Sequence, residues 1–273
     1  MNLAGLALVL FSLFWPFGAL AAPAADLWPR WQAHNPQSTE TVDHSAWTRF
    51  LKSHVTRTPD GVNRVAYGRA GQNRQVLTGY IDRLAATPVS SLSRPEQFAY
   101  WANLYNALTV EVILKHYPVA SIQDIDISPG LFTSGPWGKK LVTVEGQPVS
   151  LDDIEHRILR PIWRDPRIHY AVNCASVGCP NLLTEAFTPA NTEALLDRGA
   201  RDYVNSTRGA QVASGRLVAS RIYEWYQADF GGSETGVIEH LKRYADAPLR
   251  QAMANTGSIA EYRYDWSLND LRG

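Results

Sequence analysis

The feature that most constrains the fold is an almost uninterrupted apolar stretch from Phe98 to Leu114. Ser93 precedes it and Glu96 follows Ser93 by three residues, which is the pattern of a capping box at a helix N-terminus. The stretch ends before Pro118, a residue that does not continue a helix. Because a helix that is apolar nearly all round must be buried, we expect the other elements to pack around it.

Hydrophobic periodicity and turn residues predict shorter elements on both sides of this helix. Helices are predicted over residues 43–56, 74–86, 151–160, 188–204 and 235–244. Strands are predicted over residues 62–67 and 259–266, and hairpins over residues 141–149 and 211–218. Helices dominate and the strands are scattered. The sequence therefore predicts the α+β class: a single, mainly helical domain with small β hairpins or a small sheet.

The N-terminus has the pattern of a cleavable export signal, residues 1–21. Residues 3–22 are apolar or small apart from Ser12, and Ala19-Leu20-Ala21 forms a small-x-small cleavage site. No Lys or Arg precedes the apolar run, so an uncleaved anchor stays open as an alternative. We expect a periplasmic or secreted protein with a linker over residues 22–42 and one domain over residues 43–273. No later apolar stretch is long enough to span a membrane, so we expect no membrane contact after signal cleavage.

The charge balance excludes some classes of partner. The chain has 26 Lys and Arg and 26 Asp and Glu, so its formal net charge is zero. No basic excess indicates binding to nucleic acid or to an anionic membrane surface. The predicted partner is a small-molecule or peptide substrate of unknown identity.

The two cysteines of the chain, Cys174 and Cys179, lie five residues apart. An oxidising compartment favours a disulfide, yet a bridge across so short a loop would stabilise the fold little. A thiolate forms near neutral pH when an imidazole, a cation or a helix N-terminus lies beside it. Histidines and carboxylates lie near Cys174 in the sequence, so Cys174 is a candidate nucleophile.

His156 and His169 are both candidate bases for a Cys174 nucleophile. Glu155 is adjacent to His156, but neighbouring helix positions diverge by about 100°. Asp152 lies four residues before His156 on the same helix face, which makes it the better orienting carboxylate. The catalytic set predicted from the sequence is therefore Cys174, His156, His169, Glu155 and Asn173.

Other polar residues are candidates for substrate binding. The backbone N–H groups of residues 174–176 could stabilise an oxyanion if the segment turns, and Asn173 could donate to the oxyanion or orient the base. Ser176 and Cys179 lie beside the nucleophile. Asn103 and Asn106 share one face of the apolar helix, where they either line a cavity or hold a neighbouring segment.

No cofactor or metal is predicted. Two histidines and two cysteines near carboxylates suggest zinc, but their spacing matches no standard zinc pattern. The sequence has no glycine-rich phosphate loop, no Gly-x-Ser-x-Gly nucleophile elbow and no His-Glu-x-x-His motif.

Several segments, in the same order, resemble the bacterial and plant family of domains of unknown function numbered 547. The matching segments are residues 98–107 (FAYWANLYNA), 151–160 (LDDIEHRILR), 169–180 (HYAVNCASVGCP), 222–230 (IYEWYQADF) and 264–269 (YDWSLN). The likeness extends from about Phe50 to the C-terminus. It implies that Glu155, His156 and Cys174 belong to the family motif, with Cys179 as an accessory. Because both histidines precede the cysteines, a papain-like site would require a permuted cysteine-hydrolase-like arrangement.

Three hypotheses follow from the sequence. The first is an exported thiol-dependent hydrolase or acyl transferase acting on an amide or thioester bond. The second is a non-catalytic binding or scaffold domain whose cysteines are bridged or buried. The third is redox chemistry at the pair Cys174 and Cys179.

Overall fold

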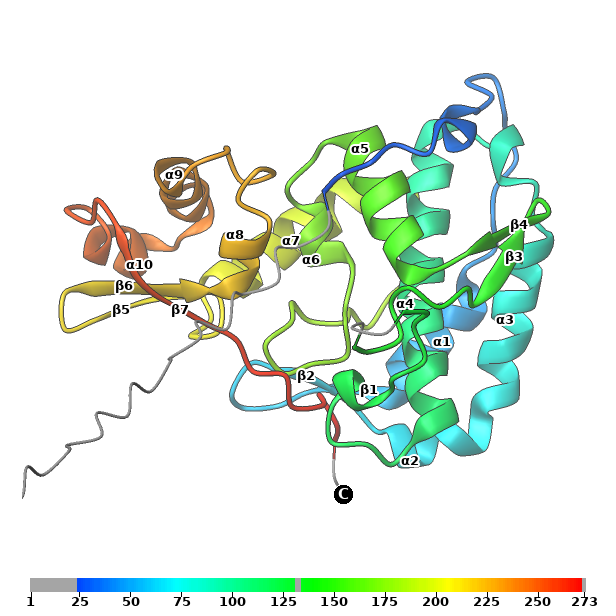
Figure 1. Cartoon of the computed structure of the whole chain (residues 1–273), viewed down its shortest axis with the longest axis horizontal. Helices are drawn as coiled ribbons and strands as arrows, with labels where there is room; N and C mark the ends of the chain where they lie inside the picture. The colour runs from blue at the N-terminus through cyan, green and yellow to red at the C-terminus, as the bar shows by residue number, and fades with distance from the viewer. Residues whose placement is uncertain (1–23, 131–133, 272–273) are drawn as a thin grey trace, which may run out of the picture.

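The computed structural model describes residues 24–130 and 134–271, so the predicted export signal lies outside the described residues. The structure is a mainly helical α+β fold with small sheets, as predicted. Figure 1 shows a larger helical lobe and a smaller C-terminal lobe that carries α8, α9, α10 and a sheet. Each lobe has its own hydrophobic core.

The larger lobe contains the elements up to α6. In chain order these are η1 (Pro29–Gln32), α1 (Ser45–His54), β1 (Val55–Arg57), β2 (Asn63–Val65), α2 (Tyr67–Ala70), η2 (Gly71–Asn73), α3 (Arg74–Ala86), η3 (Val89–Ser91), α4 (Arg94–His116), η4 (Ile122–Asp124), β3 (Val142–Val144), β4 (Gln147–Val149), η5 (Asp153–Leu159), α5 (Arg160–Trp163) and α6 (Ile168–Ala171). Strands β1 and β2 form one antiparallel pair, and β3 and β4 form another.

Helix α7 (Thr192–Val204) joins the two cores, and the smaller lobe follows it. The elements of the smaller lobe are β5 (Ala210–Ala213), β6 (Arg216–Ser220), α8 (Arg221–Trp225), α9 (Glu234–Tyr244), α10 (Ala247–Ala252) and β7 (Ile259–Arg263). Strand β6 pairs antiparallel with β5 and parallel with β7. Helix α7 contributes Leu195 and Leu196 to the larger core, and Tyr203 and Val204 to the smaller core. The chain after β7 returns to the larger lobe, where Leu268 is buried.

Helix α4 is the centre of the larger lobe, as its composition predicts. Every residue from Glu96 to Ile113 is buried. The predicted capping box is wrong, because the Ser93 side chain makes no capping hydrogen bond. Glu96 Oε1 instead accepts a hydrogen bond of 2.6 Å from the Val42 N–H. The carboxylate at this position therefore fixes the N-terminal segment to the helix.

The segment predicted as a linker packs against the larger lobe. Trp31, in η1, is only 2% exposed and lies in the core. The backbone N–H groups of Asp26 and Trp28 donate to the carbonyls of His156 and Arg157 at 3.0 and 2.9 Å. These contacts hold residues 26–31 along one side of η5.

The predicted helix over residues 151–160 contains a π-helix, η5. Its hydrogen-bond register explains why the Asp26 N–H donates to the His156 carbonyl. The Arg160 N–H bonds to the Glu155 carbonyl, five residues back. In the same register the next residue, Pro161, would have to donate to the His156 carbonyl, but proline has no N–H. Asp26 supplies the missing donor. Short π-helical segments are frequent at functional sites, and η5 carries Glu155 and His156.

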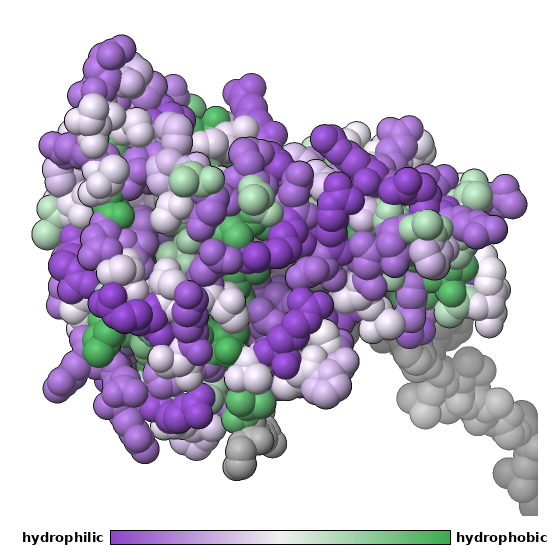
Figure 2. Space-filling view, turned by 180° about the vertical axis from the view of Figure 1, so that it is seen from behind, coloured by the Kyte–Doolittle hydropathy of each residue, from purple (hydrophilic) through white to green (hydrophobic). Residues whose placement is uncertain are grey.

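The surface is largely hydrophilic. Figure 2 shows small, separated hydrophobic areas on one face of the molecule. Among the residues described, Val76 is the only large hydrophobic side chain that is exposed. Within the same residues, no helix has both the length and the apolar character that crossing a membrane requires.

Candidate functional site

The two cysteines lie side by side in the loop that follows α6. Their sulfur atoms are 2.9 Å apart, and both cysteines are free thiols. Cys174 is partly exposed, whereas Cys179 is buried. Cys174 is therefore the more exposed residue of the pair.

Two hydroxyl groups complete a cluster around the Cys174 sulfur. Ser176 Oγ lies 3.2 Å from it and the Tyr264 hydroxyl lies 3.0 Å from it. The two hydroxyls are 2.8 Å apart. We call Cys174, Cys179, Ser176 and Tyr264 the thiol cluster.

The thiol cluster favours ionisation of Cys174 over Cys179. Burial opposes the charged form of Cys174, but hydrogen bonds from Cys179, Ser176 and Tyr264 outweigh it and lower the pKa of this thiol. Burial and the neighbouring Cys174 sulfur raise the pKa of Cys179. Burial also raises the pKa of Tyr264, so its hydroxyl keeps the proton that it donates. The arrangement stabilises a thiolate at Cys174 beside a protonated thiol at Cys179.

The C-terminal segment holds this loop from outside. The Val177 N–H donates to the Ser267 carbonyl at 2.8 Å, and the Gly178 N–H donates to the Asp265 carbonyl at 2.7 Å. The residue after the candidate nucleophile, Ala175, has a left-handed φ of 59°. Such a conformation is costly for a residue with a side chain and is often found at functional sites.

Asn173 and Asn106 hold the loop from inside. The Asn173 side chain donates to the Pro180 carbonyl at 2.6 Å and accepts from the Ala175 N–H at 2.9 Å. The Asn173 N–H donates to Asn106 Oδ1, and Asn106 Nδ2 donates to the Ala171 carbonyl, both at 2.8 Å. These two amides are used to position the backbone on both sides of Cys174.

Asn103 has a similar role further along the chain. Its side chain donates to the Phe187 carbonyl at 2.8 Å and accepts from the Phe187 N–H at 3.0 Å. Of the two roles that the sequence leaves open for Asn103 and Asn106, the structure shows the holding of a neighbouring segment.

The backbone N–H groups predicted as oxyanion donors already have partners in the loop. The Cys174 N–H donates to Cys179 Sγ at 3.0 Å, and the Ala175 N–H donates to Asn173. The Ser176 N–H points to the Cys174 sulfur and helps to lower its pKa. These groups stabilise the sulfur atoms and the turn, and they form no open oxyanion hole.

The predicted histidines lie in a second group of charged residues. His169 Nε2 is 2.7 Å from Asp229 Oδ2, and its Nδ1 is 3.5 Å from Glu155 Oε1. Burial alone would lower the pKa of His169, but these two carboxylates outweigh it and raise the pKa. Burial would raise the pKa values of Glu155 and Asp229, but the positive charges of His169 and its neighbours lower both to about 2. The two carboxylates therefore favour the protonated form of the buried His169 ring.

His156 has different partners. Arg160 Nη1 lies 3.0 Å from its Nδ1, and Asp152 Oδ1 lies 3.7 Å from its Nε2. Burial lowers the pKa of His156 to about 4 and raises that of Asp152 to about 6. Asp152 is the carboxylate that the helix spacing indicates for His156, and Glu155 instead faces His169.

Neither histidine forms a hydrogen bond with Cys174, whose side-chain partners among the described residues are those of the thiol cluster. Tyr226 connects the two groups. Its ring stacks on His169 with a centroid distance of 4.2 Å. Burial and the charges of Glu155 and Cys174 raise its pKa. The structure thus places the predicted thiol and the predicted bases in neighbouring but separate clusters.

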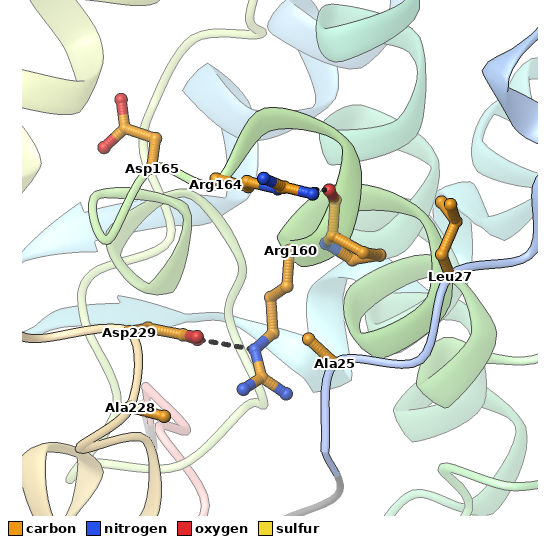
Figure 3. A pocket seen from close by; sticks show the side chains of 8 residues that line it. Ala25, Leu27, Arg160, Arg164, Asp165, Ala228 and Asp229 are labelled. Atoms are coloured by element: carbon orange, nitrogen blue, oxygen red, sulfur yellow. Dashed lines mark hydrogen bonds and ion pairs between the residues drawn. The ribbon is translucent and has the colours of Figure 1, made fainter. Parts of the chain in front are cut away.

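A surface cavity of about 400 Å³ is lined in part by Arg160 and Asp229, which contact the histidines (Figure 3). Its lining residues are Ala25, Leu27, Arg160, Pro161, Arg164, Asp165, Ala228 and Asp229. Arg160 Nε and Asp229 Oδ2 form an ion pair of 2.6 Å in the wall. The cavity touches the charged group that holds His169, and its lining includes no member of the thiol cluster.

Sequence reasoning did not find Tyr264, Asp229, Arg160 or Tyr226 as site residues. Asp229 and Tyr226 lie in the segment 222–230, and Tyr264 begins the segment 264–269. Both segments are among those in which the sequence analysis found a resemblance, and that was the available signal. Among the described residues, no three His, Cys, Asp or Glu side chains are grouped so as to hold a metal ion.

Replacing Gly178 by Ala is expected to destabilise the fold by about 1–3 kcal/mol, the usual cost of overpacking. A Cβ atom at this position would lie 2.7 Å from the Asp265 nitrogen and 2.8 Å from its carbonyl oxygen. Urea denaturation measures the change. Gly71→Ala is the matched control, because a Cβ atom there meets nothing within 4 Å. Equal stability of the two variants would show that the loop does not need this close approach.

Comparison with known proteins gives a family but no function. No curated protein and no solved structure matches the chain. A family model described as "Protein of unknown function, DUF547" matches residues 89–204. This segment includes α4, Glu155, both predicted histidines and both cysteines. Over this segment, the chain belongs to the DUF547 family of proteins of unknown function.

Proposed function

We propose that the protein is an exported thiol-dependent hydrolase or acyl transferase in which the Cys174 sulfur is the nucleophile. The observation that carries the proposal is the pair of hydroxyl donors at this sulfur: Ser176 Oγ lies 3.2 Å and the Tyr264 hydroxyl 3.0 Å from it. Hydrogen bonds to a thiolate favour the charged form, which is the reactive form of cysteine. The pattern of the first 21 residues supports the proposed export.

The same donors can stabilise the negative charge as it passes from the sulfur to the substrate during acyl transfer. When the thiolate attacks a carbonyl carbon, a carbon–sulfur bond forms and negative charge passes from sulfur to the carbonyl oxygen. The Ser176 and Tyr264 hydroxyls are then released from the sulfur and can donate to that oxygen. The leaving group departs to give an acyl-Cys174 thioester. Water or another acceptor then takes the acyl group and regenerates the thiol.

The missing histidine contact favours a thioester substrate over an amide. An amine leaving group needs a proton from a positioned acid, which in cysteine proteases is the imidazolium paired with the sulfur. No imidazole contacts Cys174 among the described residues. A thiolate leaving group needs no such proton, because free thiols have a pKa of about 8.5. We therefore assign thioesters as the preferred substrate class.

Trapping of the acyl-enzyme tests this function. The protein is mixed with a short-chain acyl thioester, quenched in acid, and examined by mass spectrometry of the intact chain and its peptides. We expect acylation at Cys174 in the wild-type protein and in Cys179→Ser, and none in Cys174→Ser. Equal labelling of Cys174→Ser, or no labelling of the folded wild-type protein by any of a series of acyl chains, would overturn the proposal. The second result would favour the non-catalytic scaffold.

A further inference from the structure

The Cys174 and Cys179 thiols are placed for chemistry with each other as well as with a substrate. Their sulfur atoms are 2.9 Å apart, while a disulfide bond is about 2.05 Å long, so bond formation needs a movement of roughly 1 Å. Both thiols are free. A disulfide could therefore form and break between them if the rest of the loop holds the two cysteines in place.

The loop between the cysteines is held in the closed shape from several sides. The Tyr203 hydroxyl donates to the Gly178 carbonyl at 2.6 Å. Arg208 Nη1 donates to the carbonyls of Val177 and Cys179 at 2.8 and 2.6 Å. These contacts do not involve the sulfur atoms. The contacts therefore hold the two cysteines near each other before any bond forms, which lowers the entropic cost of forming that bond.

The two sulfur atoms differ in the way that thiol–disulfide exchange requires. Attack on an external disulfide needs a reachable thiolate, and the second step needs a thiol that reacts only inside the protein. Cys174 is the partly exposed member and has the Ser176 and Tyr264 donors. Cys179 is 5% exposed, and the Cys174 N–H at 3.0 Å can stabilise its sulfur as negative charge develops.

We propose that Cys174 and Cys179 form a thiol–disulfide exchange pair that reacts with low-molecular-weight disulfides, with Cys174 as the attacking and Cys179 as the resolving residue. The Cys174 thiolate attacks one sulfur of the small disulfide, which forms a mixed disulfide and releases one thiolate. Cys179 then loses its proton to that thiolate or to water and attacks the Cys174 sulfur. The internal disulfide forms and the second small thiolate leaves. Counting the proton that Cys174 released on ionising, the protein loses two electrons and two protons. The small disulfide becomes two thiols once its second thiolate takes up a proton from water.

This exchange goes beyond the proposed acyl transfer, because it uses Cys179 as a reactant. It also links the two activities, since the internal disulfide removes the Cys174 nucleophile. An oxidised protein is therefore expected to lose acylation at Cys174, and a dithiol reductant is expected to restore it.

The test uses the full mature chain equilibrated with mixtures of oxidised and reduced glutathione. Remaining thiols are trapped with iodoacetamide in denaturant, and the products are resolved by mass. We expect the wild-type protein to convert to an internal disulfide without accumulating a glutathione adduct. Cys179→Ser is expected to stop at the mixed disulfide on Cys174, with at least tenfold more adduct than the wild-type protein. Cys174→Ser is expected to give no adduct while folded.

Two results would overturn the exchange pair: a stable glutathione adduct on the wild-type protein, or two free thiols under every mixture. The wild-type measurement needs no substitution, so a misfolded variant does not prevent the decision. Acylation of the reduced wild-type protein separates the two proposals. If the wild-type protein is acylated but forms no internal disulfide under any mixture, only the exchange pair fails. If the disulfide forms and acylation is absent, only the acyl-transfer function fails.

Discussion

Replacing Asp229 by Asn is expected to lower the free energy of unfolding by about 3–5 kcal/mol, the usual cost of breaking a buried ion pair from one side. Asp229 Oδ2 lies 2.6 Å from Arg160 Nε and 2.7 Å from His169 Nε2. The side chains of Arg160 and His169 are 5% and 2% exposed. Asn keeps the shape of the side chain and removes its charge. Arg160 and His169 then each lose a charged partner.

Urea denaturation of the two proteins measures this loss, and its pH dependence identifies the cause. The pKa of Asp229 is lowered to about 2, so its contribution is present above the ordinary Asp pKa of about 4 and is lost as the pH falls toward 2. The pKa of His169 is raised, so its contribution is full below the ordinary value of about 6.5 and is lost as the pH rises through the folded value. The difference between the two proteins should therefore be largest between about pH 4 and pH 6.5.

A matched control separates this effect from the general loss of a carboxylate. Glu193 pairs with Arg167 at 2.9 Å, but its side chain is 79% exposed. Glu193→Gln is expected to change stability by no more than about 1 kcal/mol at any pH, as exposed ion pairs do. If Asp229→Asn were no more destabilising than Glu193→Gln, the buried charge group would have no role in holding the fold.

Replacing Tyr264 by Phe is expected to slow alkylation of Cys174 at neutral pH by about 10- to 100-fold. A hydrogen bond to a charged group is worth roughly 1.5–3 kcal/mol, which corresponds to this factor. The Tyr264 hydroxyl lies 3.0 Å from the Cys174 sulfur, and its loss should raise the pKa of that thiol. The rate is measured with iodoacetamide by following the Cys174 peptide by mass.

Tyr262→Phe is the control for this substitution. Tyr262 lies in β7, two residues before Tyr264, and is partly exposed. Its backbone carbonyl, but not its hydroxyl, contacts Arg221. This variant should leave the alkylation rate unchanged. An equal effect of both substitutions would assign the change to the strand and not to the hydroxyl at the sulfur.

The parts of the fold that follow from local pattern could be predicted from the sequence. Helix α3 covers residues 74–86, as predicted, because its apolar spacing is helical and Pro88 follows closely. Helix α4 and the β3–β4 hairpin also agree. Of the pair β1–β2, the sequence predicted β2 but not β1, because the three residues of β1 are too few to give a periodic signal. No local pattern reveals the π-helical register of η5 or the Asp26 N–H that bonds to the His156 carbonyl.

The candidate site divides in the same way. Cys174, Ser176 and Cys179 belong to one loop, and their sequence spacing predicts their proximity. Tyr264 reaches the loop from 90 residues further along the chain, and only tertiary packing places it there. The proximity of His169 to Cys174 in the sequence was misleading, because the two nitrogen atoms of the His169 ring face Asp229 and Glu155.

The central claim is that the Cys174 sulfur of the folded protein is a reachable thiolate near neutral pH. The pH dependence of its alkylation by iodoacetamide tests this claim directly, with wild-type protein and the Cys174 peptide followed by mass. We expect faster alkylation than that of free cysteine at pH 7, with a midpoint below the free-thiol value of about 8.5. A rate no greater than that of free cysteine, or alkylation only in denaturant, would contradict the account.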